Sequence, residues 1–221
     1  MDNTEPNYYI KEVENKIITK KIFCLCKNIP INEKIIDEIE KSNCRIIEFG
    51  IQFNQPICDY LPPRIEKIVF NEKFNKFNQS VNNLPKELKK ITFGYHFNQP
   101  VDNLPTGLQR LTFGCNFNQP VDNLPTFNPE KGKKGLQRIR FSHNFNQSVN
   151  NLPSGLQRLT FGYNFNQPVD NLPTGLQRLT FGNEFNQQLD NLPIGLQSLT
   201  ISKKYNHPLN NLPASVKITR I

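Results

Sequence analysis

Phe97–Gly114 reads FNQPVDNLPTGLQRLTFG, and the chain of 221 residues is built mainly from copies of this stretch. Close copies begin at Phe117, Phe145, Phe165 and Phe185, and looser copies begin at Phe53, Phe77 and Tyr205. The successive starts are separated by 24, 20, 20, 28, 20, 20 and 20 residues. A fixed period of this length is typical of a solenoid, in which each unit buries its apolar face only against its neighbours.

Each copy ends in a segment with the spacing of a leucine-rich-repeat strand. Leu108, Leu111 and Phe113 follow the pattern L-x-x-L-x-L, and in a strand Leu111 and Phe113 would point inward while Arg110 and Thr112 point outward. We therefore predict a leucine-rich-repeat-like, open, right-handed array with few helices and a parallel β-sheet on its concave face. The expected strands, besides that of 108–113, are 44–49, 65–70, 88–93, 136–141, 156–161, 176–181, 196–201 and 216–221.

The segment between strands is expected to hold further buried layers and a row of asparagines. Phe117, Val121 and Leu124 recur as apolar positions, and an asparagine follows the phenylalanine position in every unit. Such an amide can pair with backbone groups that the turning chain leaves open, so we interpret this row as a structural ladder. Its members are Asn54, Asn78, Asn98, Asn118, Asn146, Asn166, Asn186 and Asn206. Pro105 and Gly107 indicate a type I turn over 104–107.

The non-repeating N-terminus predicts a cap. We assign residues 1–43 to an N-terminal cap and 44–221 to a solenoid of about eight 20-residue units. Within the cap, 22–26 reads as a short strand, and Asn32 precedes an amphipathic helix of about ten residues. Residues 127–134 (FNPEKGKK) are an insertion in the proline turn, for which we favour a solvated loop over a contact site.

The charge, the lack of long apolar runs and the cysteine content indicate the cellular location of the protein and the state of its thiols. The net charge is +8, with −1 from residues 1–50 and +9 from residues 51–221. No apolar run is long enough to span a bilayer, and the N-terminus has no secretory signal, so we expect an intracellular and cytoplasmic location without membrane contact. The cysteines (Cys24, Cys26, Cys44, Cys58 and Cys115) are odd in number and irregularly spaced, which favours reduced thiols in apolar slots over disulfides or a metal site.

The outward positions of the expected strands carry most of the basic excess. One column holds Lys67, Lys90, Arg110, Arg138, Arg158 and Arg178 before ending at Ser198, and Arg140 lies in the next column. Like charges side by side on a sheet repel, so either the recurring aspartates (Asp102, Asp122, Asp170 and Asp190) or an acidic ligand must neutralise them. These seven cations are our candidate partner-binding residues, for an acidic protein in the first place.

Two other readings of the basic column stay open. It could be a solvated face copied by duplication, or it could bind nucleic acid with Tyr95 and Tyr163 stacking on bases. The column does not suggest catalysis, because His96, His143 and His207 occupy different repeat positions and no catalytic, cofactor or metal-binding motif is present. A final strand at 216–221 would leave an open sheet edge, where a second copy could pair to form a homodimer.

The pattern FNQPV–LP–GL–L-FG over about 53–213 resembles the FNIP repeat, a leucine-rich-repeat relative of social amoebae and their giant viruses. The resemblance implies an interaction module without catalytic activity or cofactor, located in the host cytoplasm if the protein is viral. Some members of the family join the repeats to an F-box that docks on a ubiquitin-ligase scaffold. By that resemblance the region 1–50 could make the protein a substrate adaptor, although Asn28-Ile29-Pro30-Ile31 is only a faint echo of an F-box opening.

Overall fold

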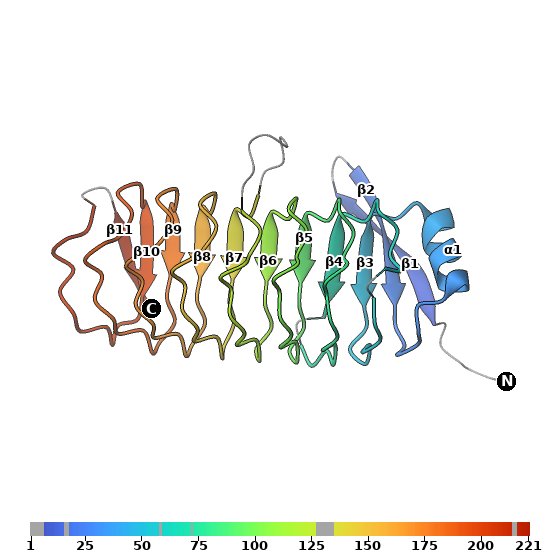
Figure 1. The fold of residues 1–221 in the computed structure, drawn as a ribbon, viewed down its shortest axis with the longest axis horizontal. Helices are drawn as coiled ribbons and strands as arrows, with labels where there is room; N and C mark the ends of the chain where they lie inside the picture. The colour runs from blue at the N-terminus through green and yellow to red at the C-terminus, as the bar shows by residue number, and fades with distance from the viewer. Residues whose placement is uncertain (1–6, 16–17, 58, 72, 127–134, 214–215) are drawn as a thin grey trace.

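In the computed structural model, eleven strands follow one another in chain order in a single sheet (Figure 1). The structure describes residues 7–15, 18–57, 59–71, 73–126, 135–213 and 216–221. The strands form an elongated stack, with helix α1 at one end beside the first strands and β11 at the other end. This arrangement is a parallel solenoid of about nine turns, which confirms the predicted leucine-rich-repeat-like solenoid, whereas the sequence indicated about eight units.

The sheet changes direction only at its first pair of strands. β1 and β2 form an antiparallel hairpin, and every later neighbour from β2 to β11 is paired in parallel. The elements are β1 (Tyr8–Asn15), β2 (Ile18–Leu25), α1 (Glu33–Ser42), β3 (Ile46–Phe49), β4 (Lys67–Phe70), β5 (Lys90–Thr92), β6 (Arg110–Thr112), β7 (Arg138–Arg140), β8 (Arg158–Thr160), β9 (Arg178–Thr180), β10 (Ser198–Ile201) and β11 (Lys217–Arg220).

The repeat strands are shorter than expected because the chain is still turning when it reaches the first leucine. The Leu108 N–H donates to the Pro105 carbonyl at 3.0 Å, so the turn spans 105–108 rather than 104–107. Proline therefore occupies the first turn position, where its carbonyl is used and its missing N–H costs nothing. Leu108 remains fully buried at the end of this turn, and the extended segment starts two residues later at Arg110.

Two parallel columns of aromatic rings fill the interior. One column comes from the strand ends and the other from the phenylalanine that opens each repeat. The ring that ends one repeat stacks closely on the ring that opens the next, as in Phe141 and Phe145 at 3.7 Å between centroids. Between repeats the second column continues at about one ring per turn, with Phe145 lying 6.0 Å from both Phe117 and Phe165. Burial of these rings supplies much of the apolar area that stabilises the array.

The N-terminal segment contains one more strand than the sequence predicted. β1 pairs with β2 along its whole length, and Tyr8 stacks on the buried Phe23 at 4.9 Å. Both strands carry many charged residues, which hid the hairpin from a search for apolar runs. The predicted helix is present as α1, with the Asn32 side chain accepting from the Ile35 N–H at 3.1 Å.

Helix α1 is tied to the array at its C-terminal end by a residue outside the cap. The Arg64 guanidinium donates to the carbonyls of Ile39 at 2.9 Å and Glu40 at 3.0 Å. A cation at this end also favours the helix dipole. Ile35 and Ile39 face the core, so α1 covers the first turn of the solenoid.

Two features predicted from the sequence fall outside the part of the chain that the structure describes. The insertion 127–134 and Cys58 lie outside the described residues. Cys24 and Cys44 are buried, and Cys26 and Cys115 are partly buried. Among the described residues, no helix is long and apolar enough to cross a membrane.

Candidate binding face

The strand register brings the predicted cations together in one line. Neighbouring strands from β4 to β9 pair Lys67 with Lys90, Lys90 with Arg110, and so on to Arg178. Paired residues of adjacent strands lie about 4.8 Å apart. We call this line the basic row, made of Lys67, Lys90, Arg110, Arg138, Arg158 and Arg178. Ser198 interrupts it, and Lys217 continues the same line on β11, a cation that the sequence analysis missed.

The arginines of the basic row have no acidic neighbour within the described part of the chain. None of Arg110, Arg138, Arg158 and Arg178 forms an ion pair there. The pKa of the Arg158 guanidinium lies below its ordinary value, first because of desolvation and then because of the charges of Arg138 and Arg178. These four arginines therefore hold like charges close together without an ion pair to the described part of the chain.

The recurring aspartates were one candidate for that compensation, and the structure places them elsewhere. Each carboxylate accepts from the asparagine side chain of the following repeat, as in Asn123 to Asp102 at 3.0 Å and Asn151 to Asp122 at 3.1 Å. Asp170 and Asp190 make the same contact with Asn191 and Asn211. The aspartates thus belong to turns between strands, and the internal explanation for the basic row is wrong.

Arg140 lies beside the basic row rather than in it. It pairs with Thr112 and Thr160 on the neighbouring strands, where the other members of this column are mostly threonine. Its side chain is exposed, and with Tyr95 and Cys115 it helps to line a small depression of about 220 Å³. Arg140 therefore adds one charge to the sheet face near the C-terminal ends of the strands.

The two tyrosines considered for base stacking lie in separate aromatic pairs. Tyr95 stacks with Phe74 at 6.1 Å, and Tyr163 stacks with His143 at 5.0 Å. Cys115 occupies the equivalent position between the two pairs, which are therefore not joined into a platform. A hydrogen bond to Glu184 raises the pKa of Tyr163 and places a carboxylate at this second pair. The geometry gives no continuous stacking surface for a single strand of nucleic acid.

The asparagines of the predicted ladder bind one another across the turns. The Asn118 Oδ1 atom accepts the Asn146 backbone N–H at 2.9 Å and the Gln147 side chain at 3.2 Å. The same backbone contact joins each successive pair from Asn54 to Asn206, at 2.8–3.2 Å. Apart from the exposed Asn206, these residues are partly buried, and the Oδ1 atoms from Asn54 to Asn186 bind the next repeat.

The ladder begins one step earlier than the repeat count indicated. Asn28 Oδ1 accepts the Asn54 N–H at 2.8 Å and the Gln55 side chain at 3.2 Å. Asn28-Ile29-Pro30 keeps the asparagine and proline of the FNQP phrase, but a lysine replaces the phenylalanine. This partial match to the repeat could have indicated from the sequence that Asn28 belongs to the ladder. The residues considered as an F-box echo therefore serve as the first step of the ladder.

In the part of the chain that the structure describes, the histidines and the possible metal ligands bear on the sequence-based expectations about metal binding and catalysis. No group of three or more histidine, cysteine, aspartate or glutamate side chains there could hold a metal ion. His143 stacks on Tyr163, and the His207 Nε2 atom lies 3.0 Å from the Asn186 carbonyl oxygen, so both rings are used locally.

Comparisons with known proteins agree with the repeat architecture. The model of the FNIP repeat matches residues 53–96, 77–116, 145–184 and 165–204. A crystal structure of CroV588, a giant-virus protein described as a novel circular LRR protein, is similar over 97% of this chain with 35% identity and a TM-score of 0.80. The chain spans 31% of the length of that protein. A comparison with curated proteins found no match.

Proposed function

The chain belongs to the family of FNIP repeat proteins, and from this premise we propose that it binds an acidic protein partner through the basic row. The architecture is a leucine-rich-repeat-like solenoid, which generally serves as a scaffold for protein interactions, in a family without known catalytic activity. The proposal adds the chemistry of the partner and the face that receives it. We place this interaction inside the cell, in the host cytoplasm if the protein is viral.

The charge of the four arginines in the basic row, which form no ion pair within the described residues, is the observation that supports the proposal. Each pair of like charges facing each other on a sheet costs about 0.2–1 kcal/mol. The Debye length of about 8 Å at physiological ionic strength is longer than the strand spacing, so salt screens this repulsion only partly. A row of carboxylates would remove the repulsion. The guanidinium groups can also bind them through two parallel hydrogen bonds.

Charge reversal within the basic row should abolish binding of the partner. We expect a variant with Arg138→Glu, Arg158→Glu and Arg178→Glu to fold normally, because all three side chains leave the sheet on its solvent side. A pull-down from nuclease-treated amoebal lysate, followed by mass spectrometry, would compare the variant with the wild-type protein. The captured protein would then be purified and its direct affinity for both forms measured.

The matched control reverses three charges away from the sheet face. Lys86, Lys203 and Lys204 are exposed residues in turns, so changing them to glutamate alters the net charge equally without touching the basic row. The control should bind like the wild-type protein. Equal binding by wild type, control and the arginine variant would refute the proposal. Ligase-scaffold components bound equally by all three forms would instead support docking through residues 1–50.

Nucleic acid is the remaining alternative for this face, and salt dependence separates it from a protein partner. Neutralising several phosphates releases counterions, so binding to DNA or RNA would weaken steeply as salt is raised. Capture that disappears after nuclease treatment would favour this reading over our proposal. The broken aromatic row described above argues against it.

A second copy of the chain could pair with β11, at the end of the solenoid opposite helix α1. All four residues of β11 are exposed, including Ile218 at 42%, and β11 is the last strand of the sheet. An open parallel edge can accept another strand, so we keep a homodimer through this edge as part of the proposed partners.

A further inference from the structure

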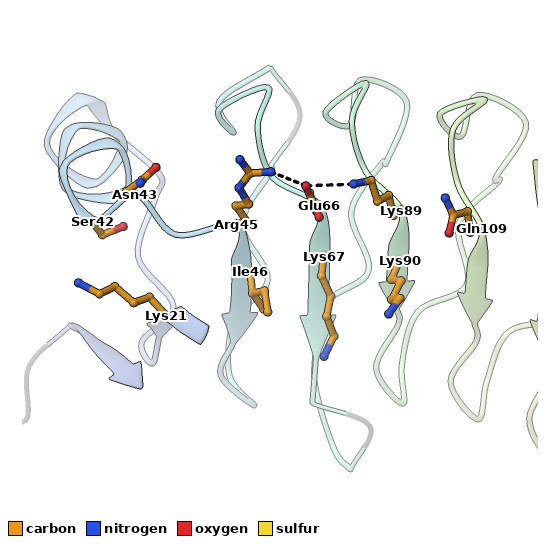
Figure 2. Close-up of a pocket in the computed structure, with 10 residues that line it drawn as sticks. All are labelled: Lys21, Ser42, Asn43, Arg45, Ile46, Glu66, Lys67, Lys89, Lys90 and Gln109. Atoms are coloured by element: carbon orange, nitrogen blue, oxygen red, sulfur yellow. Dashed lines mark hydrogen bonds and ion pairs between the residues drawn. The ribbon is translucent and has the colours of Figure 1, made fainter. Parts of the chain in front are cut away.

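A basic hollow lies where the N-terminal hairpin and helix meet the start of the repeat sheet (Figure 2). It encloses about 590 Å³, a volume typical of small-ligand sites. Ser42 and Asn43, at the C-terminal end of α1, form one side of the hollow, and the beginnings of β3 to β5 form the other. Its charged lining consists of Lys21, Arg45, Glu66, Lys67, Lys89 and Lys90.

Three of these charges form an ordered line along the upper rim of the hollow in Figure 2. The Glu66 carboxylate lies 2.6 Å from Arg45 Nη1 and 3.0 Å from Lys89 Nζ. The backbone N–H groups of Glu66 and Lys89 bind the carbonyls of Arg45 and Glu66, which fixes the three residues in register. The hydrogen bond from Lys89 is the main cause that lowers the pKa of Glu66, with Arg45 adding to it, so the carboxylate stays ionised.

The hollow keeps a large positive excess in spite of Glu66. Its lining has five cations and one carboxylate, which leaves an excess of four charges. Lys67 has no carboxylate within ion-pair distance among the described residues. Lys21 lies 3.6 Å from Glu12, the residue paired with it in the hairpin, and both side chains are exposed. The cations also come from the hairpin, the turns and the strand face, so they surround a volume instead of forming a line.

This concentration of charge departs from the repeat pattern in a specific way. The position occupied by Arg45, Glu66 and Lys89 continues along the array through the same backbone hydrogen bonds. The next five repeats carry glutamine there, at Gln109, Gln137, Gln157, Gln177 and Gln197. Arg45 and Lys89 therefore place two cations beside the hollow at a position that is uncharged from Gln109 to Gln197.

We propose that this hollow is a binding site for a phosphate group. A phosphate monoester carries about two negative charges and three acceptor oxygens, which suits the excess charge better than a single carboxylate does. Lysine ammonium groups and an arginine fork are the usual donors to such oxygens. The group could belong to a phosphorylated side chain of a protein or to a free polyphosphate. The site does not depend on whether the basic row binds a protein.

The test measures the affinity of the purified chain for tripolyphosphate and for a phosphoserine peptide, by calorimetry at physiological ionic strength. Lys89→Gln installs the residue of the later repeats and should weaken binding of the phosphate probe about tenfold, as expected for loss of one charged hydrogen bond. Arg178→Gln removes the same charge from the basic row outside the hollow and should leave the affinity unchanged. Thermal unfolding of each variant checks that the fold is intact.

A third variant changes the affinity in the opposite direction. Glu66→Gln removes the carboxylate from the hollow and releases Arg45 and Lys89, so phosphate should bind several-fold more tightly. A structural role of the Arg45–Glu66–Lys89 line would predict no such gain. Weaker phosphate binding by Glu66→Gln, or equal losses in Lys89→Gln and Arg178→Gln, would overturn the proposal.

The two probes also separate the possible sources of the phosphate. Tight binding of the phosphoserine peptide, with little binding of its serine counterpart, would assign the site to a phosphorylated protein. Binding of tripolyphosphate alone would support the site and assign it to a free polyanion. Equal binding of the two peptides, with no measurable binding of tripolyphosphate, would show that the hollow does not recognise phosphate. The partner test on the basic row uses other residues, so either proposal can fail alone.

Discussion

Replacing Phe145 with alanine should lower the free energy of unfolding by about 3–5 kcal/mol, the usual range for removal of a fully buried aromatic ring. Phe145 has no exposed surface, and its ring lies 3.7 Å from Phe141 and 6.0 Å from both Phe117 and Phe165. Rigid rings above and below prevent the cavity from closing. Guanidinium unfolding followed by circular dichroism measures the loss directly.

The position of Phe145 near the middle of the array gives a second expected effect. Each repeat of a solenoid contacts mainly its neighbours, so the N-terminal and C-terminal halves are coupled through this layer. The variant should therefore unfold over a broader denaturant range, because the halves lose part of their coupling. Tyr163→Ala is the matched control, since this ring is 40% exposed, and its loss should cost about 1 kcal/mol or less. Similar losses in both variants would contradict the role of the buried column.

Replacing Asn146 with alanine should cost about 1–3 kcal/mol, because the backbone N–H of Asn166 loses its acceptor. Asn146 Oδ1 accepts that N–H at 2.9 Å and the Gln167 side chain at 3.2 Å. No change of packing can restore the lost oxygen, whereas a truncated apolar side chain can sometimes be compensated. Hydrogen exchange of the Asn166 amide should rise together with the loss of stability.

Asn150→Ala provides the comparison within the same repeat. Asn150 is exposed, and its Oδ1 atom accepts only a long contact of 3.5 Å from Asn171. Its replacement should change stability by about 0.5 kcal/mol or less. If Asn146→Ala were as mild as this control, the ladder would be a by-product of the repeat rather than a source of stability.

The repeating part of the fold could be predicted because the same residue pattern occurs in many copies along the chain, and each copy supports the same assignment. The alternation at Arg110, Leu111 and Thr112 recurs on the neighbouring strands, so a single register explains all of them. The same repetition aligned the cations into the basic row and the asparagines into one column. The period shows which residues occupy equivalent positions in successive repeats. In a parallel sheet with a constant register, such equivalent residues lie side by side on adjacent strands.

The features that were missed lie where the chain has no second copy to compare. The charged hairpin β1–β2 lacks a strong apolar alternation, and Arg64 reaches the end of α1 from a turn 24 residues away. The hollow combines Lys21 from the hairpin with Lys89 from the repeats. Nothing in the linear spacing of these residues indicates that they line one volume. Such contacts depend on how the cap docks on the array, which the period does not determine.

The spacing of the basic row also selects among the shapes that an acidic partner could have. Successive charges lie about 4.8 Å apart, while one turn of α-helix rises 5.4 Å and side chains on one face of a strand repeat about every 6.8 Å. Over the five steps from Lys67 to Arg178, a helix with one carboxylate per turn drifts by about 3 Å, within the swing of an arginine side chain. A strand drifts by about 10 Å, or two whole charges.

The spacing of the charges in the basic row therefore nearly matches the rise per turn of an α-helix, and it does not match the side-chain spacing along one face of a strand. Two peptides of equal charge would show this difference, one helical with glutamates alternately three and four residues apart, which is about one per turn, and the other extended with glutamates at alternate positions. We expect the helical peptide to bind more tightly, as measured by fluorescence anisotropy, and equal affinities would show that the period has no influence. Because each repeat adds one strand to the sheet, the strand spacing sets the distance between the repeated charges. The same spacing then decides which secondary structure of a partner can match those charges one by one.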